Sequence, residues 1–351
     1  MYNVYKTTES SLWKSVLTRL QIDQQDIYFT PEYYSLYQHN GEGDARCFVY
    51  EEGGNVVLYP FLINSITPLG YKLDKEYYDI QGAYGYNGII TSSRDAEFIA
   101  RFHENFDAYC QENDIVAEFT RFHPLLNNQE LASPQMRTFY SRHTVYLDLS
   151  LSLDDIWTKQ ISSKNRNQIR KAEKEGVTIV ETDDYKTFKA LYDKTMSNLN
   201  ADDYFFFPQS YYEEFKASFG KNSSLCFAIL DGKAIAASMF MFSKDYAHYH
   251  LSARDRDYSK YAANNLILWY GIQKAKERGC KRFHFGGGTS SSDEDQLLHF
   301  KQNFSKVKGE FWLGQRVHNP TIYNNIVAQW KEKFPESYEH YKVRLLGYRD
   351  I

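Results

Sequence analysis

The alternation of apolar and polar positions predicts two similar β-hairpins far apart in the chain. In residues 47–63, CFVYEEGGNVVLYPFLI, two apolar runs flank a Gly-Gly-Asn turn, and in 226–242, CFAILDGKAIAASMFMF, two apolar runs flank an Asp-Gly turn. Short apolar runs joined by such turns are typical of antiparallel strand pairs. The chain therefore carries two copies of one strand–turn–strand pattern.

Each predicted hairpin is preceded by helices and followed by a third strand, a helix and a fourth strand. The apolar positions of the two following helices recur every three or four residues, as in helices that pack on a sheet. They are Ile99, Phe102, Phe106 and Tyr109 after the first hairpin, and Leu268, Ile272 and Ala275 after the second. A repeated unit of this kind predicts a duplicated α+β domain.

The join between the two copies is predicted in residues 143–157, HTVYLDLSLSLDDIW. Its apolar residues alternate as in a strand up to Leu149. Ser152 with Asp155 then resembles the capping box that opens a helix. We expect that helix to run over 153–175.

The composition is that of a globular protein large enough for two domains. The chain has 351 residues, of which 42% are hydrophobic and 25% charged. The formal net charge of -4 argues against a general nucleic-acid binder, and so against DNA, but leaves room for a local basic patch. The aromatic content of 17% fits either Tyr-rich cores or a groove that stacks sugars.

Cysteine spacing and hydropathy indicate the compartment. The four cysteines, Cys47, Cys110, Cys226 and Cys280, form no CxxC pair, so we expect buried free thiols in a reducing compartment. No run of 18 apolar residues occurs, and the N-terminal stretch lacks an apolar signal core. These features predict a cytoplasmic protein without integral membrane association.

A glycine run, FHFGGGTSSSDED in 283–295, follows a short aromatic strand. A Walker loop needs Gly-Lys-Ser/Thr, but here the glycines lead to serines and then to Asp293, Glu294 and Asp295. The spacing is not that of a dinucleotide-binding fingerprint either. Two interpretations stay open: a flexible strand exit, or a strand end that glycine allows a ligand to approach closely.

A basic segment, SSKNRNQIRKAEKEG, is predicted to be helical. It carries Lys164, Arg166, Arg170, Lys171 and Lys174. Such a run is either a solvated helix face or a surface that grips polyphosphate or RNA through salt-sensitive contacts.

The segment AHYHLSARDRDYSKYAANN combines two histidines with an anion-binding pattern. His248 and His250 are expected on one face of a strand, but no third ligand is apparent, so we expect no metal. One histidine could act as a base or a hydrogen-bond donor. Arg254 and Lys260 precede a helix that opens near Asn264, and helix N-termini with adjacent cations bind anions.

Lys301 lies between two phenylalanines in LLHFKQNFSK. This spacing could place its ammonium beside an apolar wall, or it could belong to a surface lysine whose stem covers apolar residues. No nucleophile elbow, HExxH or paired-carboxylate motif is visible in the sequence.

Several segments together resemble the FemABX-type peptidyltransferases and BioF2-like acyltransferases. KNRNQIRKAEKEGV, YHLSARDRDYSKYAANNLILWYGIQKAKERGCKRFHFGGG and HFKQNFS are similar to the second domain of that family, and YDIQGAYGYNGII and FTRFHPL to the first. The resemblance covers most of the chain in the right order. It implies two tandem GNAT-like (acyl-CoA N-acyltransferase) domains, each a mixed sheet flanked by helices. With the tail returning to the first domain, it implies domains of 1–145 plus 318–351, and of 146–317.

The resemblance also implies an activity. Family members move an acyl or aminoacyl group onto an amine of a peptidoglycan or surface-polysaccharide precursor, which can be a small molecule or lipid-linked. The donor would be acyl-CoA or aminoacyl-tRNA, without a bound cofactor, and the oligomeric state stays open. An acyl-CoA-dependent N-acetyltransferase of a sugar amine, and a non-catalytic module that binds a glycan or nucleotide sugar, are the alternatives.

Site residues follow from the matching motifs. Lys301, in the family's FK pair, is expected to contact the reacting ester or oxyanion, and His250 to relay a proton. The glycine run would form the cleft floor, and the acidic segment after it a mobile flap. The other predicted residues are Arg254, Lys260, Asn264, Gly286 and Gly287 for the donor, and Tyr84, Tyr86 and Arg166 for the acceptor.

Departures from the family pattern bear on the donor. Ser305 replaces the usual glycine of FKxxFG, and the long charged helical hairpin that supports tRNA in some members is missing. The glycine-rich CoA pyrophosphate loop of simple GNAT enzymes is absent from 254–264. The sequence therefore does not decide between the two donors.

Overall fold

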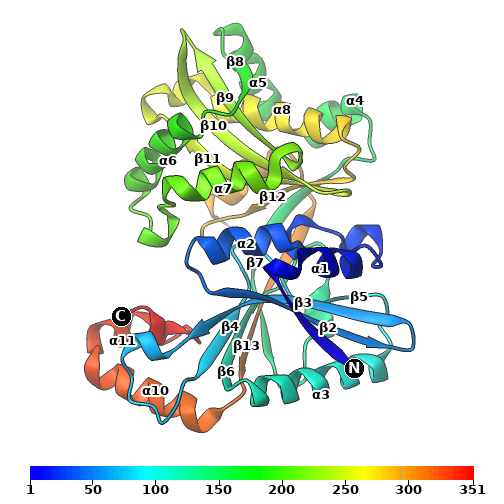
Figure 1. Cartoon of the computed structure of the whole chain (residues 1–351). Helices are drawn as coiled ribbons and strands as arrows, with labels where there is room; N and C mark the ends of the chain where they lie inside the picture. Colours follow the sequence, from blue (N-terminus) through cyan, green and yellow to red (C-terminus); the bar gives the residue numbers. More distant parts are fainter. Residues whose placement is uncertain (293) are drawn as a thin grey trace. The chain divides into compact units, whose positions relative to one another are not determined.

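Two units make up the computed structural model, which describes residues 1–292 and 294–351 (Figure 1). Each unit is a mixed sheet flanked by helices, so the predicted fold class is confirmed. Unit 1 consists of Met1–Gln24, Tyr28–Ser141 and Phe311–Ile351, and unit 2 of Gln25–Ile27 and Arg142–Glu310. The domain limits predicted from the sequence, 1–145 plus 318–351 and 146–317, stay a prediction.

The sheet of unit 1 has the strand order β1-β2-β3-β4-β6-β13, and β5 pairs with β3. The strands are β1 Tyr2–Lys6, β2 Asp44–Glu52, β3 Asn55–Ser65, β4 Tyr78–Gln81, β5 Ile90–Thr91, β6 Ile115–Arg121 and β13 Lys308–Val317, of which 311–317 belong to this unit. Neighbouring strands are antiparallel except for β4 and β6, which are parallel.

The sheet of unit 2 repeats this arrangement, with the order β7-β12-β11-β10-β9-β8. The strands are β7 Arg137–Asp148, of which 142–148 belong to unit 2, β8 Thr178–Thr182, β9 Ser223–Leu230, β10 Lys233–Phe242, β11 Tyr246–Arg254 and β12 Arg282–Gly287. β11 and β12 are the parallel pair, in register over three residue pairs that end at His248 and His284. Both predicted hairpins are therefore confirmed, as β2–β3 and β9–β10.

Helices of unit 1 bury the apolar positions that the sequence pattern indicated. The helices are α1 Ser10–Leu17, α2 Pro31–His39, α3 Ala96–Glu112, α10 Pro320–Lys333 and α11 Pro335–Tyr341. α3 connects the parallel strands β4 and β6, and its Phe102 and Phe106 are buried against Phe48 of β2. The core of this unit is therefore formed by aromatic rings packed edge to face, an arrangement favoured over face-to-face stacking.

In unit 2, α8 connects the parallel strands as α3 does in unit 1. The helices are α4 Leu153–Asp155, α5 Ser163–Lys174, α6 Tyr185–Leu199, α7 Gln209–Phe219, α8 Ala263–Glu277 and α9 Gln296–Gln302. α5 and α8 share one core cluster with the sheet, and α6 and α7 cover its other face (Figure 1).

The single helix predicted over 153–175 is divided in two. A turn of π-helix, Ile156–Gln160, follows α4, and Ile161 is extended with φ -74° and ψ 125°. Ser162 then caps α5 by accepting a hydrogen bond from the Asn165 amide at 3.2 Å. The periodicity of the sequence continues through this break because Ile161 stays buried although its backbone is extended.

The C-terminal segment closes a second core cluster of unit 1 around Trp330 and Tyr348. Arg349 donates from Nε to both carboxylate oxygens of Asp79 on β4, at 2.9 and 2.8 Å. Tyr348 donates its hydroxyl to the same carboxylate at 2.7 Å. The last residues of the chain therefore satisfy a fully buried carboxylate near the middle of this sheet.

We predict that His318→Leu destabilises the protein by about 3–5 kcal/mol, because it removes the imidazole partner of the buried Glu118 carboxylate. Burial raises the pKa of Glu118, but the bonds from His318 (3.0 Å) and Tyr59 (2.6 Å) outweigh it and lower that pKa. Urea unfolding of the variant measures the loss. As the control, Arg94→Leu breaks an exposed pair with Glu130 and should cost less than about 1 kcal/mol. Equal losses in the two variants would contradict this prediction.

Candidate functional site

Each of the three glycines at the end of β12 suits its position for a different structural reason. Gly286 has φ 78°, in the left-handed region, at a shift of register between β12 and β7. A Cβ on Gly287 would lie 3.0 Å from the carbonyl oxygen of His143 on β7, and a Cβ on Gly288 would lie 2.5 Å from Asp295 Oδ1. The run is therefore a tightly packed strand exit, with none of the open backbone of a phosphate loop.

Asp295 organises the segment that follows the glycines. Its Oδ2 accepts hydrogen bonds from the amides of Thr289 and Ser290, both at 2.9 Å, and from their hydroxyls at 2.6 and 3.1 Å. Its Oδ1 accepts from the amide of Leu298 at 2.9 Å and so caps α9. Burial alone would raise the pKa of Asp295, but these donors hold it well below its usual range. Asp293 lies outside the described residues, and the mobility of the predicted flap stays a prediction.

Lys301 reaches the glycine run from α9. Its side chain is 7% exposed, and Nζ donates to the carbonyl oxygen of Gly287 at 2.6 Å. Burial lowers the pKa of Lys301 to about 7, against the raising effect of the Asp295 charge. Phe304, three residues after Lys301, is fully buried, and its ring stacks on that of Phe285. Of the two interpretations of the sequence, the apolar wall is the one that the structure supports.

His250 is partly buried beneath α7. Its Nε2 lies 3.1 Å from the hydroxyl of Tyr211, and its ring stacks on Phe215. Burial, aided by the charge of His248, lowers the pKa of His250 to about 3. A ring with this pKa accepts a proton poorly at neutral pH, and the relay role of His250 stays a prediction.

His248 makes different contacts from His250. Its Nε2 lies 2.8 Å from Asp26 Oδ2, and its Nδ1 lies 3.4 Å from Nδ1 of His284. All three side chains are buried. Sequence reasoning missed Asp26, because 222 residues separate it from His248, but His284 could have been found from the alternation of Phe283 and Phe285. The carboxylate and imidazole could ligate a metal, and the expectation of no metal stays a prediction.

The residues predicted to hold the donor surround the exit of β11. Arg254 and Lys260 are exposed at the two ends of the 3₁₀ turn Arg256–Tyr261. Asn264 lies in the first turn of α8, and in the described part of the chain its Oδ1 is buried without a hydrogen-bond partner. Two cations beside an N-terminus that no side chain caps suit an anionic group. Their role as donor site stays a prediction.

Tyr84 and Tyr86 belong to unit 1, where they are part of an aromatic wall. The carbonyl oxygen of Tyr84 accepts the Tyr33 hydroxyl at 2.5 Å. The ring of Tyr86 packs edge-on against Tyr28 and Phe311, with centroids 5.2 and 5.3 Å away. Partly exposed Tyr rings of this kind could stack on a sugar or planar group.

Arg166, the third predicted acceptor residue, has a local structural function. Its Nη1 donates to the carbonyl oxygens of Trp157 and Thr158, both at 3.1 Å, and of Ile161 at 2.5 Å. It therefore closes the end of the π-helical turn. Other cations of α5 are exposed: Lys164, Arg170, Lys171 and Lys174.

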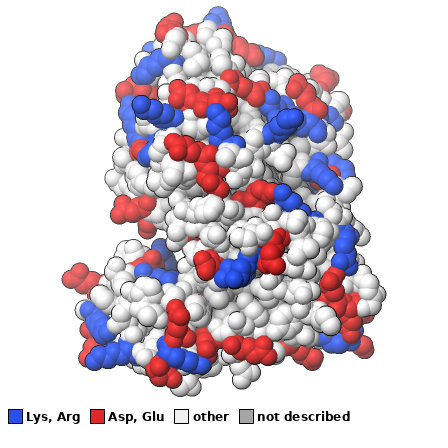
Figure 2. Space-filling view, in the orientation of Figure 1, with Lys and Arg blue, Asp and Glu red and all other residues white. Residues whose placement is uncertain are grey.

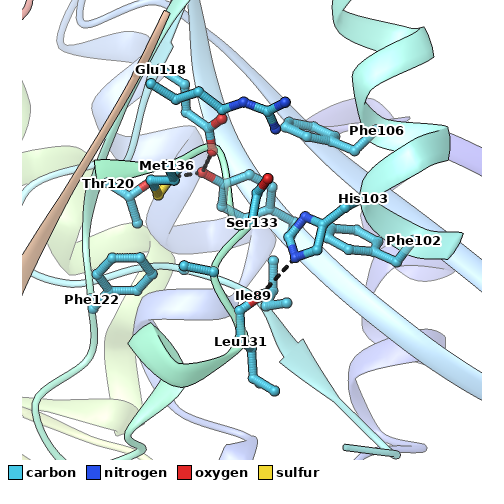
Figure 3. A pocket seen from close by; sticks show the side chains of 14 residues that line it. Ile89, Phe102, His103, Phe106, Glu118, Thr120, Phe122, Leu131, Ser133 and Met136 are labelled. Atoms are coloured by element: carbon cyan, nitrogen blue, oxygen red, sulfur yellow. Dashed lines mark hydrogen bonds between the residues drawn. The ribbon is translucent and has the colours of Figure 1, made fainter. Parts of the chain in front are cut away.

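A small cavity of about 20 Å³ lies in unit 1, between α3, β6 and the turn Asn128–Leu131 (Figure 3). Its walls are mainly apolar, with Phe102, Phe106 and Met136 among them. Its polar groups bond to neighbours: Glu118 to Tyr59, and His103 Nε2 to the carbonyl oxygen of Leu131 at 2.9 Å. None of the predicted site residues lines it. We therefore centre the candidate site on Lys301 in unit 2.

Surface charge does not single out another site on the face shown in Figure 2, where acidic and basic side chains are intermixed. Among the described residues, no helix is long and apolar enough to cross a membrane.

We predict that the His250 ring stays neutral between about pH 8 and about pH 5, as its lowered pKa requires. The unfolded chain binds this proton near 6.5 and the folded chain only near 3. Stability due to the neutral ring is therefore present above 6.5 and lost as the pH falls toward 3. Imidazole NMR, with His250→Gln to assign the signal, measures it. A titration midpoint near the ordinary value would refute the burial argument.

Comparisons with known proteins show which folds this chain resembles. Residues 161–302 match the acetyltransferase (GNAT) domain. A search of curated proteins found no match. The crystal structure of FemX has a TM-score of 0.68 at 14% identity, over 92% of this chain and 99% of that one.

Two other solved structures also cover most of the chain. The C-terminal domain of a putative lysylphosphatidylglycerol synthetase from Agrobacterium fabrum has a TM-score of 0.55 at 14% identity, over 90% of this chain and 93% of that one. L-PGS from Bacillus licheniformis has a TM-score of 0.53 at 18% identity, over 81% and 87%. The chain therefore has the fold of FemX over nearly its whole length, and its residues 161–302 match the GNAT acetyltransferase domain, as the resemblance predicted.

Proposed function

We propose that this protein transfers an acyl or aminoacyl group to an amine of a cell-envelope precursor, with the reacting centre in unit 2. The observation that carries the proposal is the buried amine of Lys301, held 2.6 Å from the carbonyl oxygen of Gly287 within the GNAT-matching segment. A surface lysine would show neither this burial nor a pKa lowered to about 7.

The chemistry needs a donor aimed at developing negative charge. When an amine attacks the carbonyl carbon of an ester or thioester, a C–N bond forms, the carbonyl oxygen becomes an oxyanion, and the C–O or C–S bond then breaks. The proton that the attacking nitrogen loses is taken up by the leaving oxygen or sulfur, so the products are an amide and an alcohol or thiol. A fixed ammonium at the oxyanion stabilises the transition state without reorganisation, because it is already oriented. We assign this role to Lys301, whose amine is oriented by Gly287 before any substrate binds.

The substrate class rests on weaker support than the reaction type. FemX and the lysylphosphatidylglycerol synthetase domain share the fold, and the name of the synthetase describes an aminoacyl ester of a membrane lipid. These likenesses support aminoacyl transfer in the cell envelope. The GNAT match supports the second candidate, an acyl-CoA-dependent N-acyltransferase of a sugar amine.

A binding screen of the purified chain against acetyl-CoA, aminoacyl-tRNA and UDP-linked precursors tests the proposal. Binding of one donor and one amine-bearing acceptor, followed by formation of the amide, would establish it. Tight binding of a glycan or nucleotide sugar without any transfer would support a binding module instead.

We predict that two pairs of variants separate the donors. Arg254→Ala with Lys260→Ala should weaken acyl-CoA binding, because these exposed cations precede α8 in the sequence and no side chain caps the N-terminus of that helix. Lys171→Ala with Lys174→Ala should weaken tRNA binding and make its salt dependence shallower, by roughly one unit of slope for each phosphate that is no longer neutralised. Each pair is the matched control for the other. Binding that neither pair changes would mean that the donor site lies elsewhere.

We predict that Lys301→Met keeps the fold and acceptor binding but lowers turnover by roughly 100- to 1,000-fold, the usual loss for one oxyanion donor. Lys301→Arg should recover only part of the rate, since a planar guanidinium does not occupy the place of a compact ammonium. The control is Lys306→Met, because this exposed lysine lies five residues away. It should change stability by less than about 0.5 kcal/mol and leave the rate unaffected. A near-normal rate in Lys301→Met would remove the catalytic assignment.

A further inference from the structure

We propose that Asp295 is a positioning residue for Lys301, because its carboxylate joins the end of β12 to the first turn of α9 and so fixes the amine against Gly287. The kinetic consequence rests on the proposed function, which makes Lys301 catalytic. The geometric part does not, since it concerns the placement and protonation of the amine alone.

The two oxygens of the carboxylate hold the two segments that meet at the amine. Oδ2 binds the strand exit, through the amides and hydroxyls of Thr289 and Ser290 at 2.6 to 3.1 Å. Oδ1 binds the helix, through the amide of Leu298 at 2.9 Å. Gly287 comes just before the strand exit, separated from Thr289 by Gly288, and Lys301 lies on α9. A change in this carboxylate therefore moves one partner of the 2.6 Å bond between them relative to the other.

Gly288 provides the space for this arrangement. A Cβ at this position would lie 2.5 Å from Oδ1 and 2.6 Å from Cγ of Asp295. From β7, Arg142 Nη1 donates to the carbonyl oxygen of Gly288 at 3.1 Å. The strand exit is thus held by a carboxylate and a guanidinium.

An ordinary helix cap accepts fewer hydrogen bonds than Asp295 does. Asp184, which caps α6 in the same unit, is exposed and bonds the amide of Thr187 at 3.0 Å. Asp295 is 7% exposed and accepts hydrogen bonds from five donor atoms. Capping alone accounts for one of those five. The other four act on the strand exit that carries the acceptor for Lys301.

The charge of Asp295 also affects the protonation of the amine. Burial lowers the pKa of Lys301, and the carboxylate opposes that effect. An oxyanion donor must be protonated, so the active form is lost as the pH rises through about 7. Without the carboxylate, that loss should occur at lower pH. If Asp295 served only as a helix cap, its replacement would not change the pH at which the active form is lost.

The experiment is an NMR titration of lysine side chains in the full chain, labelled at Cε and assigned with Lys301→Met. In the wild type, we expect a midpoint near 7. Asp295→Asn should move the midpoint to lower pH. Asp295→Ser should do the same while preserving the helix cap, since Ser and Asp cap equally well, which covers the case in which Asn fails to fold. The matched control, Asp184→Asn, should leave the midpoint unchanged.

Turnover is measured on the same variants. Gly288→Ala keeps the charge but displaces the carboxylate. We therefore expect turnover to fall by roughly 100-fold, while the pH at which activity is lost does not move to lower values. An unchanged Lys301 midpoint in Asp295→Asn and Asp295→Ser overturns the inference, whatever the turnover. A shifted midpoint together with a normal rate in Lys301→Met overturns the proposed function and supports the placement of the amine by Asp295.

Discussion

Burying an amine costs free energy unless its hydrogens find acceptors, and the Gly287 carbonyl accepts one of those of Lys301. The organisation of the site follows from it. Gly287 has to approach β7 closely, Gly288 has to leave room for a carboxylate, and α9 has to begin where that carboxylate can cap it. The segment after the glycines looks flexible and acidic in the sequence, but hydrogen bonds to the Asp295 carboxylate hold it in place. The same burial that demands these contacts brings the amine near the pKa at which a proton moves readily at neutral pH.

Most of the fold could be predicted because its signals are local. Apolar alternation marked both hairpins, and spacings of three and four marked α3 and α8, whose apolar positions are buried. The division of the predicted helix at Ile161 could not be seen in the same way. A buried residue in an extended conformation keeps the helical pattern of burial, and the break depends on Ser162 capping the helix after it and on Arg166 closing the turn before it.

The site could be predicted in part, and the limit lies in long-range contacts. The family motif identified Lys301, but spacing between two phenylalanines does not distinguish a buried amine from a surface one. The sequence does not show that Arg166 donates hydrogen bonds to three backbone carbonyl oxygens, because these contacts depend on the π-helical turn. Asp26 gave no signal at all, since its partner His248 lies 222 residues away. Residues whose roles depend on such pairings are visible only once the chain is folded.

The hydrogen bonds of Arg349 and Tyr348 to Asp79 have a consequence for biosynthesis. All of unit 2 lies before residue 311, so a growing chain contains the whole of that unit while unit 1 still lacks a strand and two helices. Of the two units, unit 1 begins earlier in the chain and is the later one to complete its core. Until Tyr348 and Arg349 are synthesised, the carboxylate of Asp79 has neither of these partners, and the apolar surface that later receives Trp330 stays exposed.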